Sequence, residues 1–482
     1  MKISYLPKID RQALRLLRQA ESIEEVINIL VGVVSRKVVF HSLMEYQKWF
    51  FMISQEQLIK NPELIYGKAM IFFLQGELQE AGKLRNLIDS KNKYALLYDF
   101  LTSSLTLDEM AEHVEEIADV FPEDFFQLTV KRPCAINGLW DFTCYGEDII
   151  NGRAVKLEKI IRNLYGEEAD DILDIMKAEC LYQQNKCYEA LVILLGKIPK
   201  LERKKDIRLL FVALTLETYI MIINGQASST HSLMDNLRKK TIVSEKKLFL
   251  DNVNALDAWA AMYDGEYMKL SSWLKEEAPD EISDFSFLDL FRYMVKIRTY
   301  IIQGKYLAVT KLAMRVMPLL EEKKRYMDMC ELHMLWALSE DAAGRIKESY
   351  KHIEKMLELS SKYRYDRLIA DEGMRMYQLL KKYTKDCGKS KYLAYLIKLT
   401  ENTAMLHIRY LKSQLPENVE LTPTELKVIR LVAECYTNKE ISDVMGIALD
   451  TVKQHCSHIF SKLDVKNRQK AIKVARDIGI IG

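Results

Sequence analysis

Short polar turns interrupt long amphipathic segments at a regular interval along most of this chain. Gly or Asn stands in each turn, at positions 185, 225, 265, 304 and 344, so successive turns are 40, 40, 39 and 40 residues apart. Both residue types tolerate the left-handed backbone conformation that ends a helix. The pattern therefore predicts a series of helical hairpins, each with one apolar side.

A single hairpin of this kind cannot bury its apolar side, whereas stacked hairpins bury it against one another. We therefore expect an all-α chain, with a right-handed superhelix of tetratricopeptide (TPR) type over residues 61–412. The period exceeds the standard repeat of about 34 residues, which requires longer linkers between hairpins. The alternative is an ordinary helical domain in which glycines occupy these positions by coincidence, and the even spacing disfavours it.

Two parts of the chain depart from this rhythm. Residues 1–60 form a predicted N-terminal helical segment, with helices around 11–20, 23–33 and 43–52. Residues 91–177 lack the repeat, and Lys131–Trp140 is the least helix-like stretch of the chain. An eroded repeat or plain connection is favoured there over a loop on the concave face of the superhelix.

Composition limits the classes of function that are open to the chain. Its 482 residues are 49% hydrophobic and 29% charged, which is typical of a globular protein. With 70 Lys and Arg against 68 Asp and Glu the net charge is +2, so any contact with nucleic acid requires a local basic patch. No apolar run approaches the length of about 18 residues that spans a membrane, and we expect a cytoplasmic protein without membrane contact.

Catalytic and metal chemistry find little support in the sequence. The eight cysteines are scattered without a CxxC pair, which favours free thiols in a reducing compartment. The eight histidines show neither a catalytic triad nor metal-ligand spacing, although His455, Cys456 and His458 are close neighbours. We therefore expect no enzyme, no catalytic residues, no metal and no cofactor.

The last 60 residues carry the sharpest local signals. A polar linker that contains Pro, residues 413–422, precedes a predicted final unit at 423–482. Thr422 and Glu425 form a predicted capping box around Pro423, and Thr437 with Glu440 repeats the device. Gly446 is expected to end the short second helix, which bears Ile441, Val444 and Met445. Two helices joined by a tight Gly turn indicate a helix-turn-helix.

The third helix of this unit, around 449–463, has two distinct faces. One face is apolar, and its members fall at helical spacing: Val452, Cys456, Ile459 and Leu463. The opposite face is small and polar, with Asp450, Lys453, Gln454, Ser457 and Ser461. Such side chains suit a helix in the major groove, because Lys recognises guanine acceptors and Gln pairs with adenine. Lys453, Gln454 and Ser457 are the predicted base-reading residues.

Charge supports this interpretation. From Asp450 onward seven positive side chains face three negative ones, a local net charge of +4 in a nearly neutral protein. The residues predicted to contact phosphates are Asn438, Lys439, Thr451, Lys462 and Lys466. A solvated face on a capping bundle of the superhelix is the alternative, which two capping boxes and a Gly turn disfavour.

These motifs resemble a known family. The stretch Leu421–Glu434, with Thr437–Ile441, Thr451–His455 and Lys462–Arg468, resembles the LuxR-type DNA-binding domain without a gap. Cys435 and Asp464 stand where the family usually has Gly, and Ala448 replaces the usual capping Ser, which weakens that cap. The resemblance implies a four-helix domain whose last helix pairs two copies, so we expect a homodimer on DNA through Ile472, Val474, Ala475 and Ile478.

The upstream helices resemble the superhelix of MalT-like LuxR regulators, in the stretch from Leu43–Trp49 to Gln75–Leu78. That resemblance implies a small-molecule effector or a protein partner in the superhelix. Those regulators usually carry an ATP-binding module, but GxxxxGK[ST] is absent here and Cys387–Ser390 keeps only its tail. The signal is then expected to reach the DNA-binding domain through Tyr410–Thr422, with the linker 413–422 as the hinge. Aromatic residues in the repeats could line a groove or pack between hairpins: Tyr182, Tyr219, Trp259, Tyr263, Tyr300 and Trp336.

Two functions follow from these observations. The first is a bacterial transcriptional regulator that binds double-stranded DNA and lies on the nucleoid when bound. The alternative is a non-catalytic TPR scaffold or adaptor whose terminal domain mediates protein contacts. The polar Lys453, Gln454 and Ser457 face favours DNA, because a protein-docking face more often carries aromatic anchors.

Overall fold

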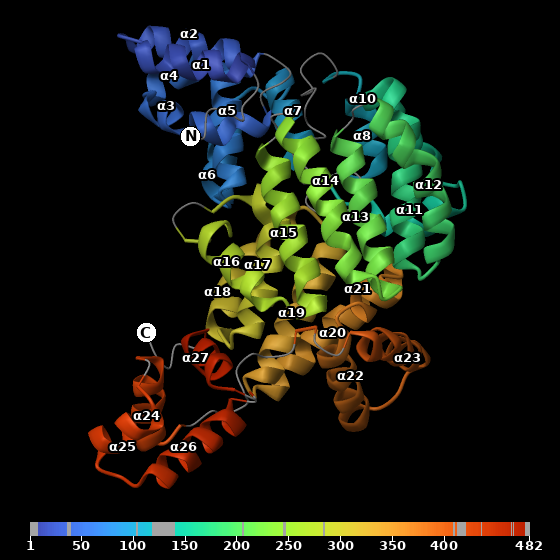
Figure 1. Cartoon of the computed structure of the whole chain (residues 1–482). Helices are drawn as coiled ribbons and strands as arrows, with labels where there is room; N and C mark the ends of the chain where they lie inside the picture. The colour runs from blue at the N-terminus through green and yellow to red at the C-terminus, as the bar shows by residue number, and fades with distance from the viewer. Residues whose placement is uncertain are drawn as a thin grey trace.

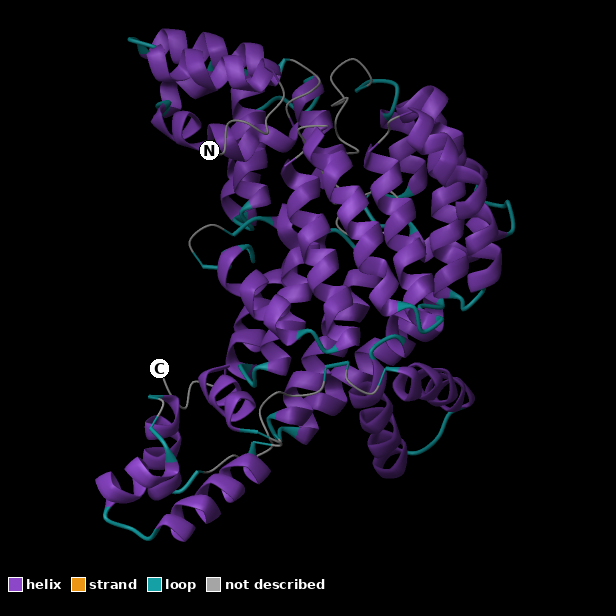
Figure 2. Cartoon of the chain, in the orientation of Figure 1, coloured by secondary structure: helices purple, strands orange, loops and turns teal. Residues whose placement is uncertain are grey.

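The computed structural model describes residues 8–35, 40–102, 105–117, 140–204, 207–243, 247–282, 285–407, 410–411, 421–434, 436–463, 465 and 467–477. Within these ranges every regular element is a helix, as Figure 2 shows. The prediction of an all-α chain is therefore confirmed. None of the described helices combines the length and the apolar character needed to cross a membrane.

The first part of the chain folds into short helices that follow the predicted segments closely. The third predicted helix differs, because its first half is a 3₁₀ turn, Phe40–Tyr46, and only its second half is α-helical. These helices share the hydrophobic core of the superhelix, and Phe50 lies 2.7 Å from where a Cβ on Gly67 would stand. The α-helices are α1 (Lys8–Gln19), α2 (Ile23–Val34), α3 (Gln47–Met52) and α4 (Gln55–Ile59).

In the described part of the chain seven helical hairpins build the superhelix, and Figure 1 shows their helices side by side. The first is separated from the rest by the irregular stretch. The hairpins are α5 (Pro62–Leu74) with α6 (Leu78–Arg85), α11 (Ala169–Gln183) with α12 (Cys187–Lys204), α13 (Ile207–Ile223) with α14 (Thr230–Val243), α15 (Lys247–Asp264) with α16 (Tyr267–Glu276), α17 (Leu290–Ile302) with α18 (Tyr306–Glu322), α19 (Tyr326–Ala342) with α20 (Ile346–Tyr363), and α22 (Gly373–Cys387) with α23 (Lys391–Leu406).

The turn residues take the conformation that the sequence predicts. Asn185 and the glycines at 76, 225, 265, 304 and 344 have φ between 61° and 82°. The helix before each of these turns ends in a backbone hydrogen bond that spans the turn. For example, the Lys186 N–H donates to the Leu181 carbonyl at 2.9 Å. The fragment Cys387–Ser390 is likewise a turn between helices, since Gly388 ends α22 and the Ser390 hydroxyl caps α23.

The irregular stretch is helical at both of its ends. Its elements are α7 (Lys93–Thr102), α8 (Leu107–His113), the 3₁₀ turn Thr143–Tyr145, α9 (Gly146–Ile150), α10 (Val155–Tyr165) and the 3₁₀ turn Gly166–Glu168. Most of Lys131–Trp140 lies outside the described residues. Trp140 itself is buried, and its indole N–H donates to the Phe100 carbonyl at 3.3 Å.

Aromatic rings link successive hairpins through the interior of the superhelix. Tyr182 on α11 lies 5.9 Å from Tyr219 on α13, measured between ring centroids. Tyr219 lies 4.6 Å from Trp259 on α15, and Trp259 lies 4.9 Å from Tyr263. All four are at most 7% exposed, so these rings pack between hairpins. A cavity beside them has a volume of only about 20 Å³, enough for a single water molecule.

The chain fills this interior with its own later segments. The short helix α21 (Asp366–Ala370) packs against α11 from almost 200 residues earlier. The Leu368 N–H donates to the Gln183 side chain at 3.1 Å, and the Tyr182 hydroxyl donates to Asp371 at 2.5 Å. The described residues therefore fill the space that an open, aromatic-lined concave groove would take at this level of the superhelix.

The described residues that directly follow the last hairpin are also buried there. His407 Nε2 lies 2.7 Å from the Ile222 carbonyl, and Tyr410 and Leu411 are 1% and 0% exposed. Tyr410 and Leu411 belong to the core of the superhelix. Tyr410 and Leu411, at the start of the predicted signal path Tyr410–Thr422, are thus packed in place, and most of the predicted hinge, the linker 413–422, lies outside the described residues.

Candidate nucleic-acid interface

Four helices with a hydrophobic core of their own follow the superhelix. They are α24 (Pro423–Ala433), α25 (Asn438–Met445), α26 (Leu449–Lys462) and α27 (Arg468–Asp477). Figure 1 shows them in red at the end of the chain. The core comprises Leu421, Val428, Ile429, Val432, Ile441, Val452, Cys456, Ile459, Leu463, Ala471 and Ala475.

The predicted capping box opens α24. The Thr422 hydroxyl accepts the Glu425 N–H at 3.3 Å, and the Thr422 N–H donates to the Glu425 carboxylate at 2.7 Å. Glu425 is also buried and accepts a hydrogen bond from the Lys462 ammonium at 2.7 Å. Burial by itself raises the pKa of Glu425, but the bonds from Lys462 and Thr422 hold that pKa below its ordinary value. This carboxylate therefore ties the start of α24 to the end of α26.

A second capping box and a left-handed glycine delimit α25, as the sequence predicts. Thr437 and Glu440 cap its start, and Gly446 ends it with φ 65°. The Ser442 hydroxyl donates to the Ile447 carbonyl at 2.6 Å, which ties the helix to the following turn. Of the apolar residues on this helix, Ile441 is buried, whereas Val444 is 60% exposed. The helix has only two turns, so its buried face is narrow and Ile441 occupies it.

The recognition helix α26 has the two faces that the sequence predicts. Val452, Cys456, Ile459 and Leu463 are at most 6% exposed and hold the helix on the core. Asp450, Lys453, Gln454, Ser457 and Ser461 all face solvent. Ala448 stands at the cap position without a side-chain bond, in agreement with the expected weak cap. The Lys453 ammonium lies 3.0 Å from the Asp450 carboxylate, an exposed pair that phosphate or base acceptors can replace.

The residues predicted to contact phosphate differ in their exposure to solvent and in whether their side chains already have partners. Lys439 is exposed in the first turn of α25, and Thr451 is half-buried in the first turn of α26. Lys462 is engaged with Glu425, and the Asn438 side-chain oxygen accepts a bond from Arg468 at 3.4 Å. Lys466 lies outside the described residues. Lys439 and Thr451 are thus the accessible members of this set.

Arg468 has a role that the sequence reading missed. Its guanidinium donates to the Val432 carbonyl at 3.1 Å, to the Tyr436 carbonyl and to Asn438. These bonds hold the turn between α24 and α25 against the start of α27. A hint was available, because a positive charge in the first turn of a helix opposes the helix dipole and therefore points to another task.

The last helix divides its apolar residues between the core and the surface. Asn467 caps α27 by accepting the Lys470 N–H at 2.9 Å. Ala471 and Ala475 are fully buried in the core of their own domain, whereas Ile472 and Val474 are only partly buried. Ile478 lies outside the described residues. Of the residues predicted to form a dimer contact, Ile472 and Val474 retain accessible surface.

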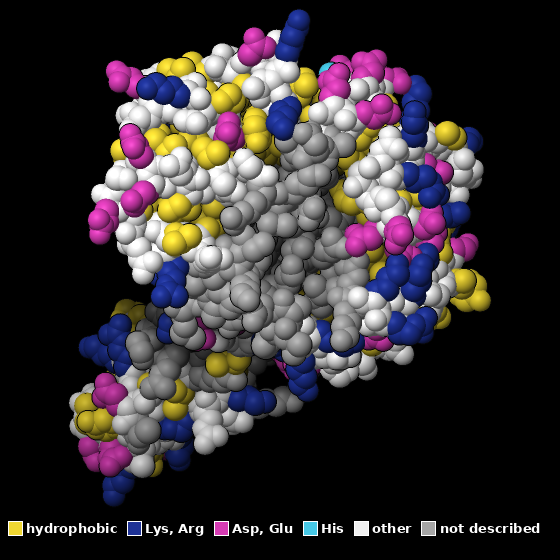
Figure 3. Space-filling model, turned by 90° about the horizontal axis from the view of Figure 1, so that it is seen from above, with side chains coloured by type: hydrophobic (Ala, Val, Ile, Leu, Met, Phe, Trp, Pro, Cys, Tyr) yellow, Lys and Arg dark blue, Asp and Glu magenta, His cyan; other side chains and the backbone are white. Residues whose placement is uncertain are grey.

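Charge outside this domain is mixed. Figure 3 shows positive and negative side chains interspersed over the face of the molecule that is seen from above. No group of three or more His, Cys, Asp or Glu side chains in the described part of the chain is arranged to hold a metal ion. The described cysteines are free thiols.

The fold and this site define a helical-repeat protein with a terminal helix-turn-helix domain. Residues 419–475 match the family of bacterial regulatory proteins of the luxR family, and residues 169–386 match the MalT-like TPR region. The chain therefore carries a LuxR-type helix-turn-helix domain behind a MalT-like TPR superhelix.

Individual relatives match a short part of the chain. Transcriptional regulatory protein LiaR of Bacillus subtilis (strain 168) is 49% identical over 51 residues, which cover 11% of this chain and 24% of LiaR. Response regulator protein VraR of Staphylococcus aureus (strain Mu3 / ATCC 700698) is 42% identical over 52 residues, 11% of this chain and 25% of VraR. The chain thus spans about a quarter of the length of these curated relatives.

Proposed function

We propose that this protein is a non-catalytic, DNA-binding transcriptional regulator of the bacterial cytoplasm, associated with the nucleoid when bound. The observation that carries the proposal is the division of α26 into a buried apolar face and an exposed polar face. A helix held in this way presents its free face to the major groove. The match of residues 419–475 to the luxR family supports the same function.

In this proposal the exposed face of α26 reads sequence. Lys453 bonds to guanine acceptors, Gln454 pairs with adenine, and Ser457 contacts a neighbouring base edge. Lys439 and Thr451 contact phosphates, which position the helix without reading sequence. Lys462 stands at the same surface, but its ammonium must leave Glu425 or be shared between Glu425 and a phosphate.

Selection of bound sites from randomised duplex DNA with the full-length protein tests this function. An enriched motif of defined sequence is the expected result, and binding should weaken as salt rises, because Lys side chains displace counterions from the phosphates. A pool that stays random after repeated selection, at low salt as well, contradicts sequence-specific DNA binding. It would favour the adaptor alternative, in which the terminal domain contacts protein.

We further infer that two copies pair on DNA through α27. Ile472 and Val474 supply the apolar surface, while Ala475 serves the core of its own domain. Two half-sites in the selected motif would accord with such a pair, since a two-fold protein contact is mirrored in the DNA. A single half-site would count against it.

We also propose that the superhelix senses an effector or docks a partner and transmits the result to the terminal domain. His407, Tyr410 and Leu411 support this role, because they are buried in the superhelix and precede the DNA-binding domain in the chain. A ligand shifts the exposure of α26 only if it binds the two arrangements of these residues with different affinity. Comparing DNA binding by the full chain with and without a candidate effector tests the coupling.

A further inference from the structure

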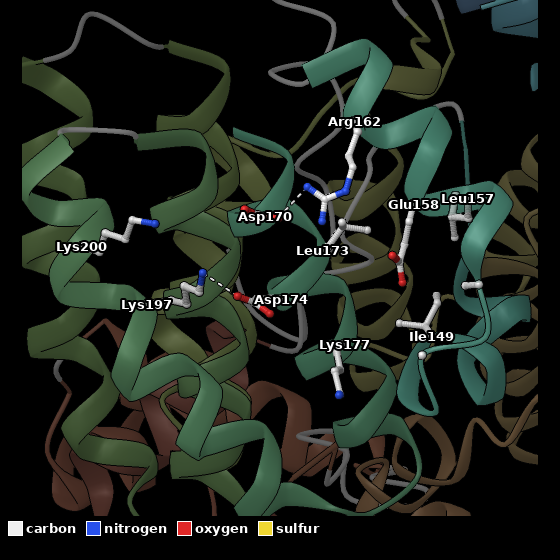
Figure 4. A pocket seen from close by; sticks show the side chains of 12 residues that line it. Ile149, Leu157, Glu158, Arg162, Asp170, Leu173, Asp174, Lys177, Lys197 and Lys200 are labelled. Atoms are coloured by element: carbon white, nitrogen blue, oxygen red, sulfur yellow. Dashed lines mark ion pairs between the residues drawn. The ribbon is translucent and has the colours of Figure 1, made fainter. Parts of the chain in front are cut away.

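A cleft of about 460 Å³ opens beside the first hairpin of the MalT-like region. Helix α11 forms its floor, and α10 with the end of α9 and α12 form its two sides (Figure 4). This volume is within the range of about 300–1,000 Å³ that is usual for small-molecule sites. It also lies outside the interior that the aromatic rings and α21 fill.

The cleft has apolar patches between charged groups. Leu157 and Ile149 come from the α9–α10 side, and Leu173 projects from α11 between them and α12. Gly152, at the turn between α9 and α10, leaves its edge open, since a Cβ there would meet nothing within 4 Å. An elongated ligand with an apolar middle could therefore enter from this side.

Most charges around the cleft already have partners. Arg162 pairs with Asp170 at 2.8 Å, and Lys197 pairs with Asp174 at 2.5 Å, as the dashed lines in Figure 4 mark. Lys200 reaches past the cleft to Asp171 at 2.8 Å. These pairs fix the walls and leave little net charge for a purely anionic or purely cationic ligand.

Two opposite charges in the cleft remain without a partner among the described residues. Glu158 projects from α10, and Lys177 projects from α11 on the other side of Ile149. Both side chains are half-buried, so each has lost part of its hydration without a hydrogen bond or an ion pair in return. A molecule that carries both charges would satisfy both groups at once.

We propose that this cleft binds a small zwitterion with an apolar side chain, namely a free amino acid or a short peptide with free ends. Lys177 binds its carboxylate, Glu158 binds its ammonium group, and Leu157, Ile149 and Leu173 contact its apolar part. An effect of this ligand on DNA binding depends on the sensing role proposed above, whereas the binding of the ligand does not. The binding itself is tested without DNA.

Isothermal titration calorimetry of the full chain with leucine and with trileucine tests the site. Saturable binding of at least one of them is expected, and the two arms separate an amino acid from a peptide. N-acetyl-trileucine amide, which lacks both terminal charges, should not bind. The variants Lys177→Met and Glu158→Gln should each weaken binding by about tenfold or more, the loss expected for one charge-assisted hydrogen bond.

Matched controls come from exposed residues of the same region. Lys159→Met and Glu167→Gln make the same changes outside the cleft and should leave the affinity unchanged. Thermal melting checks that every variant is folded. Absence of saturable binding by both probes, equal binding of the blocked peptide, or equal losses in the control variants would overturn the proposal.

The effect on DNA is measured separately, by fluorescence anisotropy on the selected duplex with and without the bound probe. If the probe binds and DNA affinity does not change, the site stands and the coupling to DNA fails. If the selection yields no duplex that the protein binds, the proposed function fails, while the calorimetric result still stands.

Discussion

The ring of Tyr410 stacks on the ring of Tyr263, with centroids 3.9 Å apart and planes 20° from parallel. The Tyr410 hydroxyl donates to Glu372 at 3.1 Å and accepts from Arg298 at 3.2 Å. The His407 ring contacts the ring of Tyr263 edge-on, with centroids 5.1 Å apart. The last described part of the superhelix before the DNA-binding domain is thus held by Tyr410, whose ring is buried and stacked and whose hydroxyl is hydrogen-bonded.

Replacing Tyr410 by Ala should destabilise the superhelix by about 3–5 kcal/mol, the usual cost of removing a buried aromatic ring. Tyr410→Phe keeps the stack and loses the hydroxyl, and it should cost only about 1–3 kcal/mol. Tyr188→Ala is the control, because that ring is 76% exposed. Denaturant unfolding of the full chain measures all three, and equal effects of Tyr410→Ala and Tyr188→Ala would refute the anchoring role.

Gln454→Ala should lower affinity for the selected site by about 1–3 kcal/mol and relax one base position. Lys439→Ala should weaken binding to all sequences alike and reduce the salt dependence, because it removes a phosphate contact. Gln469→Ala, an exposed Gln on α27, is the matched control. Binding titrations on the selected duplex and on single-base variants separate these effects. If Lys439→Ala and Gln454→Ala relax specificity equally, the assignment of base and phosphate contacts is wrong.

Glu425→Ala should destabilise the terminal domain by about 1–3 kcal/mol, since it removes half of a capping box and leaves Lys462 without its carboxylate. Glu440→Ala removes the corresponding half of the second box, where Glu440 has no ion pair with any described residue, and should cost less. Thermal melting of the two variants makes the comparison. Equal losses would show that the pair of Glu425 and Lys462 contributes nothing.

The same carboxylate predicts an acid limit for this domain. The pKa of Glu425 is below its ordinary value of 4.5 in the folded state, so its contribution is complete above pH 4.5. As the pH falls through the folded pKa, the carboxylate becomes protonated and the contribution is lost. Wild-type protein should therefore lose stability below pH 4.5 more steeply than Glu425→Gln, as unfolding monitored on the recognition helix can show.

A histidine pair makes the superhelix sensitive over a higher range of pH. His333 and His352 lie with their Nδ1 atoms 3.0 Å apart, and burial lowers the pKa of His333 to about 4 and also lowers that of His352. Both are neutral in the fold but take up protons near pH 6.5 when unfolded. Stability is thus complete above pH 6.5 and decreases as the pH falls towards 4. His333→Gln should flatten the decrease in melting temperature over this range, and an unchanged slope would contradict the assignment.

Val474→Asp should weaken binding to an operator with two half-sites and leave binding to one half-site unchanged. The physical reason is that a charge in an apolar contact between α27 helices must be desolvated. Analytical ultracentrifugation with each duplex measures the stoichiometry. An unchanged two-copy complex would rule out pairing through this face.

Local signals in the sequence determined the elements of this protein. Gly and Asn at the turns, two Thr–Glu capping boxes, Gly446 and Asn467 act within about five residues of their own positions, so their roles could be read directly. The face of α26 that packs inward also follows from helical spacing, because the domain has one core and the helix has one apolar stripe.

Contacts between distant segments were decided only by the tertiary structure. Tyr410 meets Tyr263 and Leu368 meets Gln183 across more than 100 residues, so no local pattern marks the filling of the interior. Helical spacing likewise does not show that Arg468 donates hydrogen bonds to the turn before α25. Nor does it show that Val444 is exposed. The cleft is a further case, since Glu158 and Lys177 are ordinary surface charges in the sequence and become a pair of half-buried, opposite charges only when α10 packs against α11.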